Sequence, residues 1–265
     1  MNPFRRPSVI LAALAVVPLP LATLAVFAFP ANERQEAFPR QEPKDDNRPP
    51  HPIPTIPGVV VLFSGKPEEV AANWRKNKSE QDAAWTVENG AMVARGGDIV
   101  SKREFSDFQL HVEFKLPYEP NATGQGRGNS GVGLQSRYEI QVLNSFGWAR
   151  PGKGDGGALY NQAAPLVNAA LPPRQWQTYD IVFRAPKFDA EGKQLLQKAR
   201  VTVYQNGVCI HNNQEIDGPT GIGSDRPIDK PGPIFLQDHG HPVHYRNIWV
   251  LPLPDKGSEK YESTQ

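Results

Sequence analysis

The stretch Gly232–Val250, GPIFLQDHGHPVHYRNIWV, places polar groups directly after an apolar run. Ile234–Leu236 is typical of a buried strand, and Gln237, Asp238 and His239 follow at its end. Side chains at a strand end can converge on a surface pocket without disturbing the core. The carboxylate of Asp238 could orient the imidazole of His239 for proton transfer, or it could simply cap the turn. The residues alone leave both interpretations open.

A second polar row accompanies the alternating segment Tyr138–Val142. Successive strand residues point to opposite faces, so Arg137, Glu139 and Gln141 share the face opposite the apolar residues, at spacings of roughly 6–7 Å. A cation, a carboxylate and an amide in one row suit the planar polar contacts that bind a carbohydrate. The same pattern also describes an ordinary solvated sheet face, so the row is a candidate site only.

A glycine-rich segment, Gly124–Gly128, precedes Asn129 and an expected strand at Val132–Ser136. A phosphate-binding loop would lead into the N-terminus of a helix, so the segment does not favour a nucleotide site. A rim loop beside the polar row fits better. Asn129 would then be either a hydrogen-bonding partner of a ligand or a turn former.

The histidines of the C-terminal stretch raise the question of a metal. His239 and His241 form a His-x-His pattern and His244 follows, but the sequence offers no obvious third ligand. We therefore assign no metal site and expect no cofactor, while a divalent metal stays open. The single cysteine, Cys209, excludes an internal disulfide and a cysteine-rich zinc site.

Period-two alternation predicts the strands that must position these groups. It is cleanest over Phe108–Leu116 and returns at Tyr179–Phe183. Val201–Ile210 has the pattern of a hairpin, and its Asn206-Gly207 pair suits a type I′ turn. Many short strands between turns predict a β-sandwich or barrel, and we expect one all-β sandwich.

Composition agrees with this fold class. Helical periodicity is scarce, although Glu68–Asn73 could form one short helix, and 23 glycines and 27 prolines suit many turns. The formal net charge is +1, from 29 basic and 28 acidic residues. No global field would attract nucleic acid, so we expect no nucleic-acid partner.

The N-terminal part is expected to be an export segment followed by a tether. Arg5 and Arg6 precede the apolar run Val9–Phe29, so residues 1–30 are interpreted as a signal peptide or a membrane anchor. Residues 31–57 hold seven prolines among charged residues, which predicts a disordered linker without chemistry of its own. The folded domain is expected over residues 58–252, and residues 253–265 are a polar tail. The folded part would be exported: periplasmic, secreted, or anchored through a membrane tether to the outer side of the inner membrane.

Ten segments occur in a characteristic order along the expected domain. They are VLFSGK (61–66) with Trp74 downstream, WTVENG (85–90), FSDFQL (105–110), EF (113–114), GNSGV (128–132), YEIQVL (138–143), GALY (157–160), WQTY (176–179), NG (206–207) and the stretch 232–250. Each segment is weakly specific, but their order is highly specific. In this order the chain resembles the 3-keto-disaccharide hydrolase domain family of bacterial secreted proteins.

The resemblance implies a concanavalin-like jelly-roll sandwich and activity on glycosides whose C3 hydroxyl a separate dehydrogenase has oxidised to a ketone. We therefore expect an exported carbohydrate-active hydrolase whose partner is a saccharide or glycoside substrate. Ser64 and Asn144 stand where the family often has aspartate. Because this chain has asparagine at position 144, we do not count a carboxylate at that position among the groups essential for catalysis.

A 3-keto glycoside relaxes the demand for acidic groups. Most glycosidases need two carboxylates, whereas the candidate strand offers only Glu139. The ketone acidifies the C2 hydrogen, so one base can remove it while the C1 substituent leaves by β-elimination, and water then adds. We expect Glu139 or His239 to be the base and His239, tuned by Asp238, to protonate the leaving oxygen.

Other polar and aromatic side chains are expected to bind the substrate. Arg137, Gln141 or Asn129 would hold the enolate oxygen. The full expected substrate-binding set is Asn129, Arg137, Gln141, Tyr160, Gln237 and Arg246.

Two other function classes fit the same residues. A non-catalytic, lectin-like carbohydrate-binding module would use the aromatic side chains Trp148, Tyr160 and Trp249, with Glu139 and His239 as hydrogen-bonding partners. A tethered structural or partner-binding domain would carry the polar rows only as solvated faces. Convergence of Glu139 and His239 on one pocket would favour the enzyme over this last class.

Overall fold

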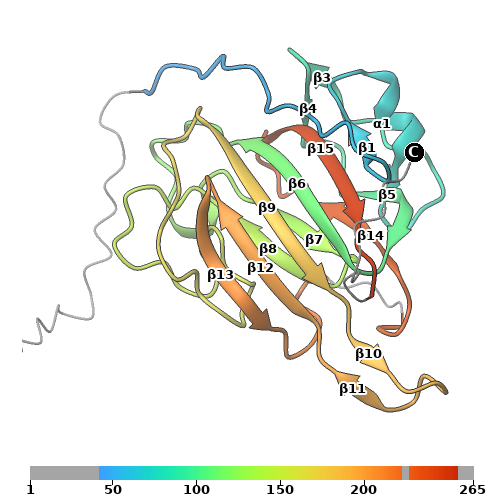
Figure 1. Ribbon diagram of the computed structural model, residues 1–265. Coiled ribbons are helices and arrows are strands. Elements are labelled where there is room, and N and C mark those ends of the chain that lie inside the picture. Colours follow the sequence, from blue (N-terminus) through green and yellow to red (C-terminus); the bar gives the residue numbers. More distant parts are fainter. Residues whose placement is uncertain (1–41, 223–226, 256–265) are drawn as a thin grey trace, which may run out of the picture. The chain divides into compact units, whose positions relative to one another are not determined.

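The computed structural model describes residues 42–222 and 227–255, and nearly all of its regular structure is antiparallel β-strand (Figure 1). The expected signal peptide or anchor at residues 1–30 lies outside the described residues, as does most of the polar tail. Within the described part, no helix is long and apolar enough to cross a bilayer. The elements are β1 (Val60–Phe63), α1 (Glu68–Asn73), β2 (Trp74–Lys76), β3 (Val87–Glu88), β4 (Ala91–Val93), β5 (Ile99–Phe105), β6 (Phe108–Lys115), η1 (Gly124–Gly126), β7 (Ser130–Leu134), β8 (Tyr138–Val142), β9 (Trp176–Arg184), β10 (Lys187–Phe188), β11 (Leu195–Gln197), β12 (Arg200–Gln205), β13 (Val208–Glu215), β14 (Gly232–Leu236) and β15 (His244–Pro252).

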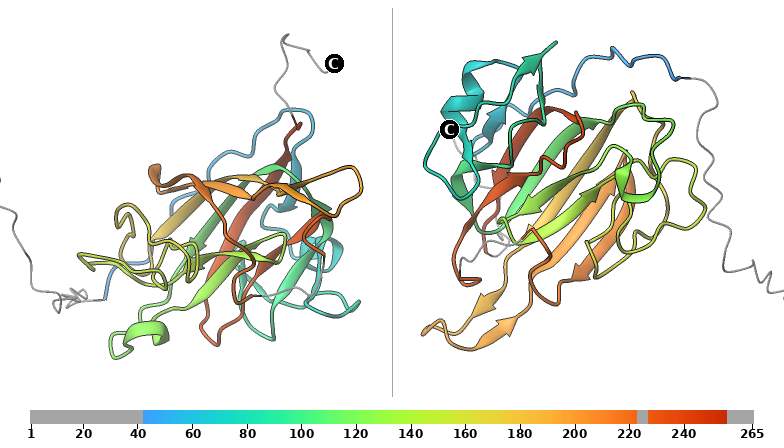
Figure 2. Two further views of the ribbon diagram at one scale, coloured as in Figure 1. Left: turned by 90° about the horizontal axis from the view of Figure 1, so that it is seen from below. Right: turned by 180° about the vertical axis from the view of Figure 1, so that it is seen from behind.

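Two antiparallel sheets form a β-sandwich of the jelly-roll type. The larger sheet has the strand order β13-β12-β9-β6-β15-β4-β3, and β1 pairs with β15. The smaller sheet has the order β2-β5-β14-β7-β8, and β10 and β11 make a separate two-stranded ribbon. Figure 2 shows the layers from two further directions. The predicted all-β jelly-roll fold is confirmed.

Alternation along the strands builds the core between the sheets. Leu110 and Val112 of β6 and Ile140 of β8 are fully buried and belong to one apolar cluster. Burial of each such side chain stabilises the fold by about 1.5–3 kcal/mol. The intervening residues of β6 and β8 point to the two outer faces of the sandwich, and these faces carry the polar rows.

Local patterns predicted several elements well and one with a shift. Helix α1 and strand β8 have the expected bounds. Asn206 and Gly207 have φ angles of 52° and 79°, which is the positive pair of a type I′ turn. Strand β7 ends at Leu134, two residues before the expected end, because Gln135 and Ser136 have positive φ angles of 55° and 52° and form the turn into β8.

Residues 42–57, called the strap below, contain no helix or strand but hydrogen bond to the larger sheet. Arg246 donates from Nη1 to the carbonyl oxygen of Arg48 at 2.9 Å. Asn247 donates from Nδ2 to the carbonyl oxygen of His51, also at 2.9 Å. The expectation of a disordered linker is therefore wrong for this part, because side chains of β15 hold its backbone. Residues 31–41 lie outside the described residues.

Candidate active site

A pocket of about 280 Å³ lies over the outer face of the smaller sheet. Its size suits a single sugar ring better than a long oligosaccharide, since pockets for drug-sized ligands are commonly about 300–1,000 Å³. Strand β8 and the loops that adjoin β7, β8 and β14 supply the walls. The described residues that line it are Gln125, Asn129, Glu139, Gln141, Tyr160, Gly221, Ile222, Gln237 and His239.

Backbone pairing brings these distant segments together. Glu139 and Gln141 are two residues apart on β8 and therefore share its outer face. The segment that ends at Tyr160 runs beside β8, and the Tyr160 amide donates to the carbonyl oxygen of Glu139 at 3.1 Å. The Gln237 amide donates to the carbonyl oxygen of Gly131 at 3.0 Å, which places the end of β14 next to β7.

Glu139 is the only carboxylate among the described residues that line the pocket. Its residue exposure is 3%, and no described residue donates a hydrogen bond to its side-chain oxygens. Burial raises the pKa of Glu139 to about 7, and the nearby negative charge of Asp98 adds to the effect. A carboxylate with this pKa can take up and release a proton near neutral pH, as a general base must.

Gly131 leaves the space that the Glu139 carboxylate occupies. A Cβ atom built on Gly131 would lie 2.4 Å from Glu139 Oε1. Any side chain larger than hydrogen would therefore push the carboxylate out of its position. The glycine is needed here for close approach, because its φ angle is not among the positive ones.

The imidazole of His239 lies at the mouth of the same pocket and is exposed. Its ring stacks on that of His241, with centroids 6.3 Å apart and an interplanar angle of 11°. His241 in turn contacts Glu119, with Nδ1 and Oε1 2.9 Å apart. The Glu119–His241 pair thus supports the face of the His239 ring.

Asp238 does not line the pocket, and within the described part of the chain its carboxylate makes no hydrogen bond to His239. Its Oδ2 accepts from the Gly97 amide at 2.8 Å, and its Oδ1 accepts from the Gly240 amide at 3.0 Å. The carboxylate therefore holds the turn between β14 and β15 against the loop before β5. Of the two interpretations of Asp238, the geometry favours the turn cap over the catalytic partner.

Three amides form one wall. Gln141 donates from Nε2 to Gln125 Oε1 at 3.1 Å, and Asn129 donates from Nδ2 to the carbonyl oxygen of Gln125 at 2.8 Å. The Oε1 atom of Gln141 is buried without a hydrogen-bond partner among the described residues. A buried acceptor is costly when it is left unpaired, so this oxygen is a natural partner for a ligand hydroxyl.

The two arginines predicted to bind substrate lie elsewhere. Arg137 is fully buried, and its guanidinium donates to Gln135 Oε1 at 2.9 Å and to the carbonyl oxygen of Pro227 at 2.6 Å. Arg137 lies in the turn before β8, outside the strand, and these hydrogen bonds fix that turn. Arg246 lies on the larger sheet and donates from Nε to Glu113 Oε2 at 2.8 Å. Neither arginine lines this pocket.

The aromatic side chains of the lectin-like alternative are also dispersed. Tyr160 lines the pocket and is half-buried. Trp148 is buried, with the guanidinium of Arg127 lying 5.3 Å from its ring centroid. Trp249 lies on β15 of the larger sheet, stacked on His111. Among the described residues the pocket therefore has no tryptophan platform.

Several residues of the site were not predicted. Gln125 and Ile222 line the pocket, and Asp98 acts on the Glu139 carboxylate through its charge. Gln125 stands in the glycine-rich segment, where its polar side chain was a weak signal. Asp98 immediately precedes a strand, and no local pattern distinguishes it from any other surface acid.

The described residues offer no three-ligand metal cluster in this pocket. His241 is paired with Glu119, and His244 has its Nδ1 atom 3.1 Å from the carbonyl oxygen of Pro242. The site combines one buried carboxylate, one exposed imidazole and a wall of amides. Such a set supports acid–base chemistry with a single carboxylate, in contrast to the carboxylate pair of most glycosidases.

Comparisons with known proteins identify the family and the fold of the chain. The 3-keto-alpha-glucoside-1,2-lyase-like domain family matches residues 58–251. A candidate glycosyl hydrolase of known structure from Parabacteroides distasonis ATCC 8503 has 34% sequence identity and a TM-score of 0.66, over 78% of this chain and 95% of that chain. A second one from the same organism has 21% identity and a TM-score of 0.54, over 74% of this chain and 94% of that chain, and it shows the fold alone. No curated protein matches the chain.

Proposed function

Because this chain belongs to the 3-keto-alpha-glucoside-1,2-lyase-like family, we propose that it is an exported enzyme that cleaves 3-keto-glycosides. Family membership and the resemblance to candidate glycosyl hydrolases support a carbohydrate-active enzyme of the glycoside hydrolase type. The single observation that carries the finer proposal is the pairing of one buried carboxylate with one imidazole in the same pocket. Two carboxylates would be needed for ordinary glycoside hydrolysis.

In the proposed reaction Glu139 removes the proton from C2 of the sugar. The electron pair of the C2–H bond moves into an enolate on C3, which is possible because C3 is already a ketone. The buried position of Glu139 suits this role, since its pKa of about 7 makes the ionised carboxylate a stronger base than an exposed one. The amide groups of Asn129 and Gln141 lie in the same wall and would hold sugar oxygens.

The leaving group departs in the second step. The enolate re-forms the C3 ketone, a C1=C2 double bond forms, and the bond from C1 to the leaving oxygen breaks. His239 donates a proton to that oxygen. Its exposure at the pocket mouth fits this role, because the leaving group must pass into solvent.

Water completes the reaction by adding across the double bond. Its oxygen bonds to C1, and a proton returns to C2, so the net change is glycoside plus water to free 3-keto sugar plus alcohol. Glu139 is protonated after the first step. Its carboxyl proton exchanges with solvent while water replaces the leaving group, and Glu139 then delivers a solvent-derived proton to C2. No net oxidation or reduction occurs, so the ketone must be supplied by a separate dehydrogenase.

Export is the remaining part of the proposal. It rests on the apolar run and the preceding arginines of residues 1–30. A signal peptide would release the domain, whereas an uncleaved anchor would tether it to the outer side of the inner membrane. The mass of the mature protein, purified from the exported fraction of its host, distinguishes the two.

The direct test uses p-nitrophenyl 3-keto-α-glucoside and the unmodified p-nitrophenyl α-glucoside. We expect release of nitrophenol from the keto sugar alone. A lectin-like module would bind one of these sugars without releasing nitrophenol. Cleavage of the unmodified glucoside at a comparable rate would contradict the role assigned to the ketone.

A further inference from the structure

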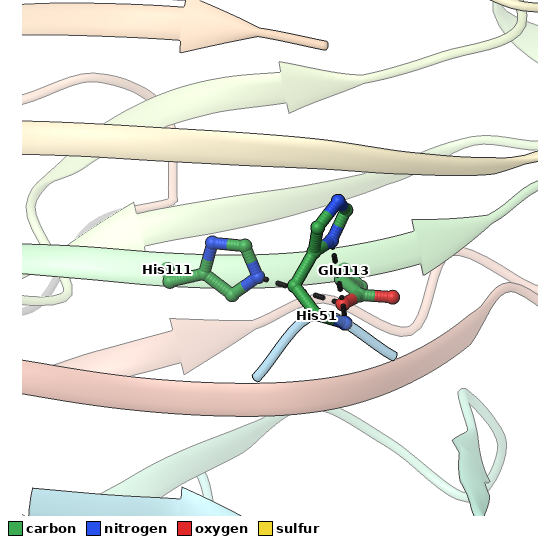
Figure 3. A group of neighbouring side chains, drawn as sticks. All are labelled: His51, His111 and Glu113. Atoms are coloured by element: carbon green, nitrogen blue, oxygen red, sulfur yellow. Dashed lines mark hydrogen bonds and ion pairs between the residues drawn. The ribbon is translucent and has the colours of Figure 1, made fainter. Parts of the chain in front are cut away.

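Three potential metal ligands converge on the outer face of the larger sheet, away from the pocket of Glu139. His111 and Glu113 are two residues apart on β6, and His51 comes from the strap (Figure 3). One atom of each, His51 Nδ1, His111 Nε2 and Glu113 Oε1, lies within 4.8 Å of the other two. Glu113 Oε1 is 3.0 Å from His51 Nδ1 and 3.6 Å from His111 Nε2.

The two separations from Glu113 Oε1 are close to what a small divalent cation requires, and the two imidazole nitrogens lie within 4.8 Å of each other. Bonds of about 2.0–2.1 Å in a tetrahedral arrangement place neighbouring donor atoms about 3.3–3.5 Å apart. Two imidazoles and one carboxylate are ligands that zinc accepts in proteins, with a fourth position left for water. Only small adjustments of the three side chains would be needed.

His111 is held in the orientation that a metal ligand needs. Its Nδ1 atom is 2.6 Å from Asp180 Oδ1, so the Nδ1–H group can donate to that carboxylate. The ring then presents Nε2 toward Glu113. A carboxylate behind the imidazole is the usual support of a metal-bound histidine, because it fixes the ring and increases its basicity.

Asn247 supplies a second, independent sign of a ligand. Its residue exposure is 2%, and its Oδ1 atom has no hydrogen-bond partner among the described residues. Its Nδ2 atom lies 2.8 Å from Glu113 Oε1 and 3.3 Å from His111 Nε2. The two amide atoms are exchanged by a half-turn of the group. The exchange would aim the unpartnered oxygen into the cluster, where bonding to a cation would replace the two hydrogen bonds that Nδ2 donates to Glu113 Oε1 and to the carbonyl oxygen of His51.

Glu113 can bind a cation through one oxygen only. Its Oε2 atom accepts from Arg246 Nε at 2.8 Å, whereas Oε1 faces the cluster and also accepts from the His51 amide at 2.6 Å. The guanidinium of Arg246 lies 3.9 Å from the ring centroid of Trp176, so packing holds it on the far side of the carboxylate. The carboxylates of Glu113 and Asp180 together offset the positive charge of Arg246.

The cluster also has access to solvent. The side chain of His51 is 53% exposed, whereas those of His111 and Glu113 are 6% and 0% exposed. An open pocket of about 600 Å³ lies beside it, and its walls include His51, His111, Asp180 and Trp249. An ion could enter from this side and keep one water ligand there.

From these observations we propose that His51, His111 and Glu113 bind one Zn²⁺ ion, which fastens the strap to the larger sheet. The family match begins at residue 58, so it does not include His51. The site would couple the position of the strap to metal supply, independently of the chemistry at Glu139.

The experiment uses the full chain without a polyhistidine tag, freed of metal with a chelator. Calorimetric titration with Zn²⁺ should give one site per chain, and Zn²⁺ should raise the melting temperature. The variant His51→Ala should weaken Zn²⁺ binding at least about 30-fold. Because His51 is on the strap and exposed, this variant should fold normally. Zn²⁺ should also protect the strap from trypsin at Lys44 in the wild type only.

His244→Ala is the matched control, since it removes a half-buried histidine of the larger sheet but none of the three ligands. It should bind Zn²⁺ as the wild type does. Two results would overturn the proposal. One is a wild-type chain that takes up no Zn²⁺, and the other is His51→Ala binding Zn²⁺ with unchanged affinity.

Discussion

The carboxylate of Glu139 occupies space that exists only because residue 131 is a glycine: a Cβ atom at Gly131 would lie 2.4 Å from Glu139 Oε1. The two residues lie on neighbouring antiparallel strands, β7 and β8. This contact ties the position of the proposed base to a backbone position that carries no functional group of its own.

Gly131→Ala should therefore impair catalysis through geometry. The added methyl group displaces the Glu139 carboxylate, and a shift of about 1 Å can lower the rate about 100-fold. The effect should appear in kcat rather than in KM. Gly126→Ala is the control, because a Cβ atom there meets nothing within 4 Å. Equal activity of both variants on a 3-keto-glucoside would show that Glu139 need not be where it lies.

The pH dependence of kcat/KM should report Glu139. The base must be ionised, and burial followed by the charge of Asp98 raises the pKa of Glu139 to about 7. The rate should therefore rise about tenfold per pH unit below pH 7 and level off above it. Asp98→Asn removes the negative charge beside Glu139 and should lower its pKa, so the acidic limb of the pH profile should move to lower pH. A limb near pH 4.5 in the wild type would mean that Glu139 is not desolvated in solution.

The same burial should make Glu139 costly for stability. In the unfolded chain its pKa is near 4.5, and in the folded protein it is about 7. The folded state therefore holds the proton more tightly, so the stability gained from protonation is present at low pH and is lost as the pH rises from 4.5 to 7. Glu139→Gln removes the charge and should be more stable than the wild type at pH 8, by about 1–3 kcal/mol. Denaturant unfolding at pH 5 and pH 8 measures it, and a less stable variant at pH 8 would contradict a buried, unpaired carboxylate.

His239→Ala should affect substrates according to their leaving groups. A proton donor matters most when the departing oxygen is basic, so an alkyl 3-keto-glucoside should lose about 10²–10⁴-fold in rate. The p-nitrophenyl substrate, whose leaving group needs little assistance, should lose far less. Stability should change little because His239 is exposed. Equal losses for both substrates would assign His239 a binding role instead.

Short-range patterns carried the fold prediction further than the site prediction. The alternation of apolar and polar residues at Tyr138–Val142 predicted both strand β8 and the face on which Glu139 lies, because alternate residues of a strand share a face. The same rule gave the wrong position for Arg137. This residue precedes β8 and follows the turn residues Gln135 and Ser136, so the alternation of faces along the strand does not extend to it. Alternation also does not say which sheet a strand joins, so the position of Arg246 on the larger sheet was not predictable.

Contacts between distant segments account for the rest. The charge of Asp98 acts on Glu139 across the sheet, and the Glu119–His241 pair joins segments far apart in sequence. His51 belongs to a proline-rich segment whose composition predicts disorder, and its place beside Glu113 depends on tertiary hydrogen bonds. A single sequence contains no periodic signal for any of these contacts.

Cleavage of a 3-keto-α-glucoside in D₂O by the wild type and by Glu139→Gln tests the central claim most directly. If Glu139 removes the C2 proton and water then adds, the wild-type product should carry deuterium at C2 by mass spectrometry. The variant should be at least about 10³-fold slower. A product that retains hydrogen at C2, formed at near-normal rate by Glu139→Gln, would contradict the account.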